Sequence, residues 1–144
     1  MAATVRKIVS TLKSPGAIGA YSQAVITDKT MYISGQIGLN PETMEFAGED
    51  VVTQAKQALT NMGHILEAGG SAFNKVVKAT VLLADINDFA AVNEVYKSYF
   101  TEKQPARAAY QAANLPKGAR VEIEAIAIVG EVIDEPSDWQ KSRL

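Results

Sequence analysis

Three charged residues near the C-terminal end of the chain have types and neighbours that could support catalysis. Arg107 follows Pro105-Ala106 and precedes two further alanines, so small residues flank a guanidinium that is well suited to bind a carboxylate through two hydrogen bonds. Glu122 and Glu124 lie on one face of a predicted strand, where a carboxylate could hold a water molecule or pass protons. Two simpler interpretations stay open: Arg107 pairs with one of these glutamates, or both glutamates lie in solvent on an edge strand.

Three further positions could line a site, and each also has a purely structural interpretation. Asn93 is four residues after Phe89 and borders the apolar side of its predicted helix, which is also typical of an amide without a role. Tyr21 ends a glycine-rich loop and could equally be a core aromatic whose hydroxyl has a partner. In Ser34-Gly35, the glycine either forms a bulge or lets a ligand approach the backbone closely.

The composition excludes several classes of site. The 144 residues include no cysteine, which rules out disulfides, thiolate nucleophiles and cysteine-bound metals. The one histidine, His64, falls on the polar side of a predicted helix and is interpreted as a solvated residue, so a multi-histidine metal site is excluded. The net charge of −2 and the spread of lysine and arginine along the chain argue against nucleic-acid binding. Neither a Gly-x-Ser-x-Gly motif nor a phosphate-binding glycine-rich loop occurs.

Hydrophobic periodicity predicts the first elements that must position these residues. Residues 24–26 and 31–34 are β-rich runs around a polar break and predict a hairpin. Residues 50–68 predict the clearest helix, with apolar residues at helical spacing and two glycines at its end. A second helix is predicted from Asn87 or Asp88 to about residue 100.

Three more strands complete the predicted fold. The near-continuous apolar run 76–84 is typical of a strand buried on both faces, and 106–112 and 120–129 predict two others. The ββ-α-β-α-ββ order predicts one α+β domain over residues 1–144, with one sheet, both helices on one face of it, and a loose polar tail at 131–144 that includes Trp139. Because two helices cover only one face, the apolar residues of the other face indicate self-association.

Several segments, in this order and spacing, together resemble the Rid (YjgF-like) family of reactive-intermediate deaminases. They extend from about Ile8 to Val129 and include Ala17-Ile18-Gly19-Ala20-Tyr21-Ser22-Gln23, Ile33-Ser34-Gly35-Gln36-Ile37-Gly38, Asp85-Ile86-Asn87-Asp88-Phe89, Pro105-Ala106-Arg107, Leu115-Pro116-Lys117 and Val121-Glu122-Ile123-Glu124-Ala125. The resemblance implies a chorismate-mutase-like α+β sandwich with a mixed sheet. It also implies a homotrimer with three clefts between subunits. We expect no cofactor and no metal.

The resemblance also implies roles for individual residues. In the family, the arginine matching Arg107 holds the substrate carboxylate, and the glutamate matching Glu122 takes part in the water and proton steps. Positions that line the same cleft match Tyr21, Ser34, Gly35, Phe89 and Asn93, whereas Glu124 matches a structural partner. Two departures stand out: Ala20 replaces the usual proline, and Ala109, which we include among the substrate-binding residues, replaces a cysteine of some members.

These expectations lead to a hypothesis about the reaction. The chain hydrolyses 2-imino and 2-enamino acids, such as 2-iminopropanoate and 2-aminoacrylate, to 2-keto acids and ammonium, which protects pyridoxal-phosphate enzymes from these intermediates. Arg107 anchors the carboxylate while water held partly by Glu122 adds to the imine carbon. The alternatives are a non-catalytic trimer that binds small carboxylates or proteins and, with less support, RNA cleavage or a chaperone-like activity.

The sequence shows no targeting or membrane segment. No apolar run approaches the roughly 18 residues that a bilayer requires, and residues 1–7 lack the apolar stretch of a secretory signal. We therefore expect a cytoplasmic protein, and leave open whether it also reaches mitochondria or the nucleus.

Overall fold

The computed structural model describes residues 2–135, which form one six-stranded sheet and two α-helices. The strands are β1 (Arg6–Val9), β2 (Ala24–Thr27), β3 (Thr30–Gln36), β4 (Val76–Leu83), β5 (Ala106–Gln111) and β6 (Val121–Ile128), the α-helices are α1 (Val51–Ala68) and α2 (Phe89–Tyr99), and short 3-10 helices span Phe73–Lys75, Ile86–Asp88 and Pro116–Gly118. The predicted tail lies partly outside the described residues, since 136–144, with Trp139, are not among them.

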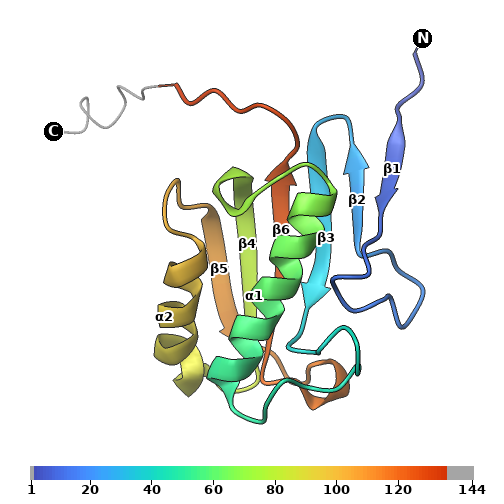
Figure 1. Ribbon diagram of the computed structural model, residues 1–144. Coiled ribbons are helices and arrows are strands. Elements are labelled where there is room, and N and C mark those ends of the chain that lie inside the picture. The colour runs from blue at the N-terminus through green and yellow to red at the C-terminus, as the bar shows by residue number, and fades with distance from the viewer. Residues whose placement is uncertain (1, 136–144) are drawn as a thin grey trace, which may run out of the picture.

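The sheet is mixed and carries both helices on one face. Its strand order is β1-β2-β3-β6-β4-β5, so β6 is central and β1 and β5 form the edges. Strands β4 and β5 pair in parallel, and every other neighbouring pair is antiparallel. In Figure 1, α1 and α2 both lie in front of the sheet, with α2 beside β5. The α+β class, the mixed sheet and the position of the helices are as predicted.

Helix α1 begins and ends where its sequence predicts. The Asp50 side chain caps it by accepting a 2.9 Å hydrogen bond from the Thr53 backbone N–H. Its apolar stripe is fully buried against the sheet, and Leu59, Met62 and Ile65 have no exposed surface. At the other end, the Gly69 N–H donates to the Ile65 carbonyl over 3.1 Å. These contacts fix α1 across the middle of the sheet.

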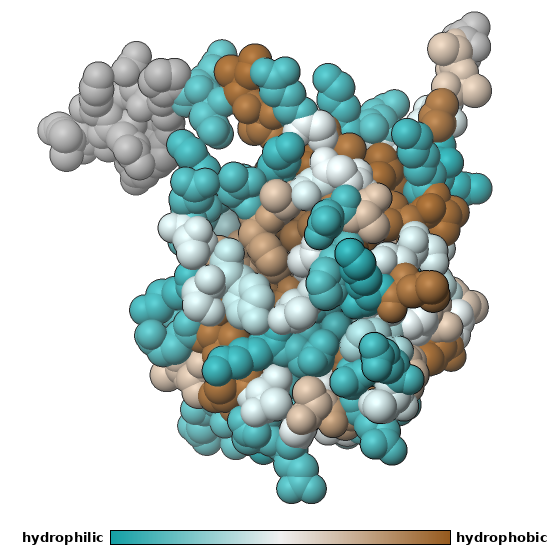
Figure 2. All heavy atoms as spheres, in the orientation of Figure 1, coloured by the Kyte–Doolittle hydropathy of each residue, from teal (hydrophilic) through white to brown (hydrophobic). Residues whose placement is uncertain are grey.

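The two faces of the sheet are buried to very different extents. Under the helices, Ala79 and Leu83 of β4 are fully buried, whereas Val77 of the same strand is 47 % exposed and Leu82 is half-buried. The prediction that residues 76–84 are buried on both faces is therefore wrong for a single chain, because no helix covers the second face. Figure 2 shows that the outer side of the helices is mainly hydrophilic.

Strand β1 is the element that the sequence analysis missed. It pairs antiparallel with β2, from Arg6 opposite Thr27 to Val9 opposite Ala24. Only Val9 of the strand is buried, so its sequence does not show the alternation that marks a half-buried strand. The observed order therefore has one more strand before the predicted hairpin.

Candidate functional site

The candidate residues divide between the two faces of the sheet. In the parallel pair β4–β5, Arg107 lies opposite Ala79, which faces the helices. In the antiparallel pair β4–β6, Glu122 lies opposite Leu82, which is on the helix-free face. Because successive strand residues point to opposite faces, Arg107 points to the helix side and Glu122 to the helix-free side. We call Phe89, Asn93, Arg107 and Ala109 the Arg107 half-site, and Tyr21, Ser34, Gly35 and Glu122 the Glu122 half-site.

In the Arg107 half-site, side chains of α2 hold the guanidinium. Its Nη1 donates a 2.7 Å hydrogen bond to Asn93 Oδ1. The ring centroids of Phe89 and Tyr96 lie 5.5 Å and 4.7 Å from the Arg107 Cζ, within cation–π range. Phe89, Asn93 and Tyr96 follow one another at i, i+4 and i+7, so one side of the helix presents all three. Ala109, two residues after Arg107 on β5, is half-buried on the same face.

Arg107 is exposed, and none of the carboxylates described in residues 2–135 forms an ion pair with it. The open interpretation that Arg107 pairs with a glutamate is therefore wrong for a single chain. A 320 Å³ hollow lies at this side chain and is lined also by Asn93, Lys97 and Gln104. The remaining guanidinium N–H groups are thus free to bind an external anion.

The Glu122 half-site is a deeper cavity of about 430 Å³ on the other side of the sheet. Strand β3 has a register shift against β6 between Ile33 and Gln36, so the backbone bulges at Ser34-Gly35. A Cβ placed on Gly35 would lie 2.7 Å from the Glu122 carboxyl carbon. The absence of a side chain at Gly35 therefore lets the Glu122 carboxyl group lie directly against the β3 backbone.

Burial in this cavity raises the pKa of the Glu122 carboxyl group above its usual value of 4.5, and the neighbouring charge of Glu124 raises it further. Glu122 is half-buried and Glu124 is exposed. The interpretation that both are edge-strand carboxylates is wrong, since β6 lies between β3 and β4. A carboxyl group with a raised pKa next to a cavity is typical of an acid–base residue.

The loop before β2 forms one wall of this cavity. The buried Gln23 shapes it, because its Oε1 accepts from the Thr11 N–H over 2.7 Å and its Nε2 donates to the Pro15 carbonyl over 2.9 Å. Tyr21 is 49 % exposed and lines the cavity, so the core-aromatic interpretation is wrong. Its hydroxyl accepts only a long 3.3 Å bond from the Ile18 N–H.

Ser34 and the opposite wall complete the Glu122 half-site. The Ser34 hydroxyl donates to the Ser22 carbonyl over 2.5 Å, which holds β3 to the loop before β2. The opposite wall is apolar, and the sequence analysis did not include its residues Ile37, Leu39, Met44 and Pro116. The signal that could have identified them is the position of Asn40-Pro41 directly after the Ser34-Gly35 motif, which marks a loop that folds back over the motif.

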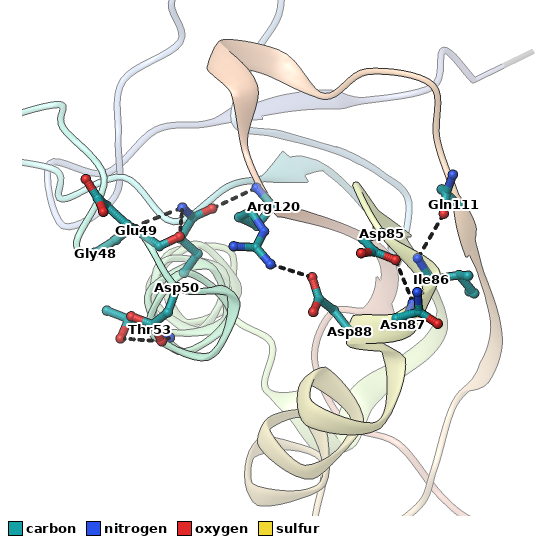
Figure 3. Close-up of polar contacts among 11 residues, drawn as sticks. Gly48, Glu49, Asp50, Thr53, Asp85, Ile86, Asn87, Asp88, Gln111 and Arg120 are labelled. Carbon is teal, nitrogen blue, oxygen red and sulfur yellow. Dashed lines mark hydrogen bonds and ion pairs between the residues drawn. The ribbon is translucent and has the colours of Figure 1, made fainter.

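One ion pair connects the elements that carry the two half-sites. Arg120, directly before β6, pairs with Asp88 over 2.9 Å (Figure 3). Asp88 directly precedes Phe89, the first residue of α2. The Arg120 backbone N–H also donates to the Gln54 Oε1 over 2.8 Å. Arg120 therefore fixes the start of the strand that bears Glu122 relative to the start of the helix that bears Phe89 and Asn93.

Among residues 2–135, no three His, Cys, Asp or Glu side chains are grouped so that they could hold a metal ion. The His64 ring is partly exposed, as expected for a solvated residue, and its Nδ1 lies 2.9 Å from the Lys13 carbonyl oxygen. Within the same residues, no helix is both long and apolar enough to cross a membrane. The cytoplasmic location stays a prediction.

Comparisons with known proteins place this geometry in a family. Residues 11–129 match the family model described as endoribonuclease L-PSP. A goat protein named 2-iminobutanoate/2-iminopropanoate deaminase is 64 % identical over 130 residues, which cover 90 % of this chain and 95 % of that protein. The crystal structure of RidA from the Antarctic bacterium Psychrobacter sp. is 50 % identical, with a TM-score of 0.83 over 85 % of this chain and 99 % of that one.

A further solved structure, Escherichia coli TdcF with bound serine, is 43 % identical, with a TM-score of 0.82 over 86 % of this chain and 99 % of that one. The family model covers most of the sequence, and the relatives match nearly end to end. The chain therefore belongs to the L-PSP family, the same group that its motifs identify as the Rid (YjgF-like) proteins.

Proposed function

We propose that the chain is a 2-iminobutanoate/2-iminopropanoate deaminase, which hydrolyses short 2-imino acids and their enamine tautomers to 2-keto acids and ammonium. The observation that carries the proposal is the exposed Arg107 guanidinium, which among residues 2–135 is held by the Asn93 amide and two aromatic rings and pairs with no carboxylate. Such a guanidinium is ready to bind a carboxylate through two hydrogen bonds. The relatives named as deaminases, and the relative solved with bound serine, support a small carboxylate as the ligand.

The two half-sites complement each other chemically but face opposite sides of one sheet. None of the residues that line the Glu122 cavity in the described chain is Lys, Arg or His, so that cavity alone has no anchor for a carboxylate. The helix-free face also exposes the aromatic residues Tyr32 and Tyr110. We infer that a second copy covers this face in a homotrimer, so that Arg107 of one subunit meets Glu122 of the next.

In this cleft the reaction needs only positioning and proton transfer. The guanidinium binds the substrate carboxylate and fixes the imine carbon, and Glu122 holds the attacking water. The water oxygen forms a bond to the imine carbon, and its proton passes through Glu122 to the nitrogen. In the resulting tetrahedral intermediate, Glu122 passes the hydroxyl proton to the amine nitrogen as the C–N bond breaks, and the O–H electron pair forms the carbonyl, so that ammonia is released and the 2-keto acid remains. Ammonia takes up a proton and leaves as ammonium.

The first test follows the lifetime of the substrate. A serine dehydratase releases 2-aminoacrylate, and semicarbazide traps the imine that forms from it. The wild-type protein is expected to suppress semicarbazone formation, and Arg107→Ala to lose most of that effect. Arg6→Ala is the matched control, because Arg6 is exposed on β1 and lies in neither half-site. If the wild type leaves trapping unchanged, the chain is a carboxylate-binding module and the deaminase proposal is wrong.

A further inference from the structure

Tyr96 stands out among the polar groups that the mechanism above does not use. Its side chain lies on α2 and is only 4 % exposed. Of the buried side-chain nitrogen and oxygen atoms described in residues 2–135, only its hydroxyl oxygen has no hydrogen-bond partner. A buried hydroxyl without a partner weakens the folded state, and phenylalanine would fill nearly the same volume without that penalty.

The surroundings of Tyr96 connect it to Arg107. One face of its ring stacks on Phe100, with centroids 4.2 Å apart and the planes 18° from parallel. The Arg107 Cζ lies 4.7 Å from the Tyr96 ring centroid, closer than to Phe89. Burial raises the pKa of Tyr96, while the positive charge of Arg107 and a close approach of its guanidinium to the hydroxyl act in the opposite direction. That approach does not reach the geometry of a full hydrogen bond. The ring is therefore fixed by the core on one side and supports the guanidinium on the other.

We propose that Tyr96 is a positioning residue for Arg107: its ring supports the guanidinium, and its hydroxyl accepts an N–H of that guanidinium once the substrate carboxylate is bound. This inference rests on the proposed function. A guanidinium has five N–H donors, of which Asn93 takes one and a bidentate carboxylate takes two. The hydroxyl of Tyr96 can accept one of those that remain, so the close approach of Arg107 to this hydroxyl would become a full hydrogen bond only in the bound state.

The same helix supplies a matched control. Tyr99 is three residues further along α2, and its hydroxyl donates to the Lys56 carbonyl over 3.1 Å and lies 3.0 Å from the Thr60 hydroxyl. Tyr99 lies in neither half-site. The substitutions Tyr96→Phe and Tyr99→Phe therefore remove the same atom from the same helix, one without a partner and one with partners.

The experiment compares the two variants with the wild type in turnover and in thermal unfolding. For Tyr96→Phe we expect KM for 2-iminopropanoate to rise about three- to tenfold with kcat within about twofold, and the Tm to stay equal or rise. For Tyr99→Phe we expect a lower Tm and an unchanged KM. Tyr96→Leu also removes the ring, and is expected to raise KM further. Two results would overturn the proposal. One is a wild-type KM for Tyr96→Phe, and the other is a lower Tm for this variant together with a KM equal to that of Tyr99→Phe.

A binding readout separates this inference from the proposed function. The keto acid 2-oxobutanoate, a product of the proposed reaction, is titrated calorimetrically into the assembled protein. Its Kd is expected to rise for Tyr96→Phe by the same factor as KM, and to stay unchanged for Tyr99→Phe. If the wild type shows no turnover, the deaminase proposal fails, and the Kd alone then decides whether Tyr96 positions Arg107. If the wild type turns over and the Kd is the same in all three proteins, the inference about Tyr96 fails.

Discussion

The Arg107 half-site and the Glu122 half-site differ in almost every physical respect. Arg107 lies on the edge strand β5, is exposed, and is held by an amide and aromatic rings. Glu122 lies on the central strand β6, is half-buried beside a 430 Å³ cavity, and has an electrostatic environment that disfavours its charge. One half-site therefore provides a permanent charge for binding, and the other provides a carboxyl group whose protonation can change.

Each half-site lacks what the other contains. The Glu122 cavity has no cation among its described lining residues, and the Arg107 hollow has no carboxylate among its own. If both act on one substrate, two copies of the chain must meet. The following predictions test this division of roles.

The largest effect is expected when two inactive variants are combined. Arg107→Ala and Glu122→Gln are each expected to lose most activity alone, but in the proposed homotrimer a mixed assembly would contain one cleft in which both residues are intact. In an equal, random mixture about three quarters of the trimers are mixed, so activity is expected to recover to about a quarter of the wild-type value. The measurement is imine turnover after the two tagged variants are refolded together.

The control for this mixture is the pair combined after folding, without exchange of subunits, which is expected to remain inactive. Activity in the refolded mixture that does not exceed the sum of the two parents would show that the half-sites do not share a cleft.

Glu122→Gln alone is expected to separate catalysis from stability. It lowers kcat by about 10²-fold, because the amide cannot relay a proton, and has a smaller effect on KM. It also raises the free energy of unfolding at pH 7, because a carboxyl group whose pKa is raised in the folded state stabilises the fold only while protonated.

The gain in stability of Glu122→Gln is expected to depend on pH. The wild-type fold loses stability as the pH rises through the raised pKa of Glu122, so the advantage of the glutamine variant is largest near neutral pH. Below the ordinary glutamate value of 4.5 the advantage disappears. Urea unfolding at several pH values measures it, and Glu67→Gln, at an exposed position of α1 outside both half-sites, serves as the control. A glutamine variant that is less stable at pH 7 would instead indicate a structural role for Glu122.

Gly35→Ala tests the Glu122 half-site without changing an ionisable group. The new Cβ would lie 2.7 Å from the Glu122 carboxyl carbon, so the carboxyl group must move away from the β3 backbone. We expect kcat to fall about tenfold with little change in KM, because the Arg107 half-site is untouched. Ser10→Ala is the control, since Ser10 is exposed and lines neither half-site. Equal kinetics for the two variants would contradict the assignment of Glu122.

Arg120→Ala is expected to have the smallest effect and to weaken both half-sites together. The Arg120 and Asp88 side chains are 42 % and 19 % exposed, so their ion pair contributes at most about 1 kcal/mol to folding. Its loss should change kcat and KM by similar factors of about two, because it connects the starts of β6 and α2. Asp88→Asn should give the same result. An effect on KM alone would show that Arg120 acts only on α2.

The regular elements could be predicted because their sequences repeat with a clear period. The apolar stripe of α1 and the alternation of β6 indicate which residues face the core, and both predictions are confirmed. Strand β1 could not be predicted in this way, because an edge strand with one buried residue has no period to detect. A pattern analysis therefore finds elements that bury a face and misses those held mainly by backbone pairing.

The residues of the candidate site could be proposed from the sequence, but their arrangement could not. The types and neighbours of Arg107 and Glu122 mark both as candidates. The two side chains face opposite sides of the sheet because of the registers in which β5 and β6 pair with β4, and these registers cannot be read from a single sequence. The sequence also gives no sign that the hydroxyl of Tyr96 lies near a guanidinium 11 residues further along the chain, because an aromatic residue at this helical spacing is typical of an ordinary core position.

Ala109 has a consequence for the conditions under which this protein can work. It occupies the face of β5 that bears Arg107, and the whole 144-residue sequence contains no cysteine. Apart from the Met44 thioether in the cavity wall, the functional groups of the two half-sites are a guanidinium, a carboxyl group, an amide and hydroxyls, none of which cycles between oxidised and reduced states as a thiol does. Turnover is therefore expected to follow the proton concentration of its surroundings and to be indifferent to their redox potential.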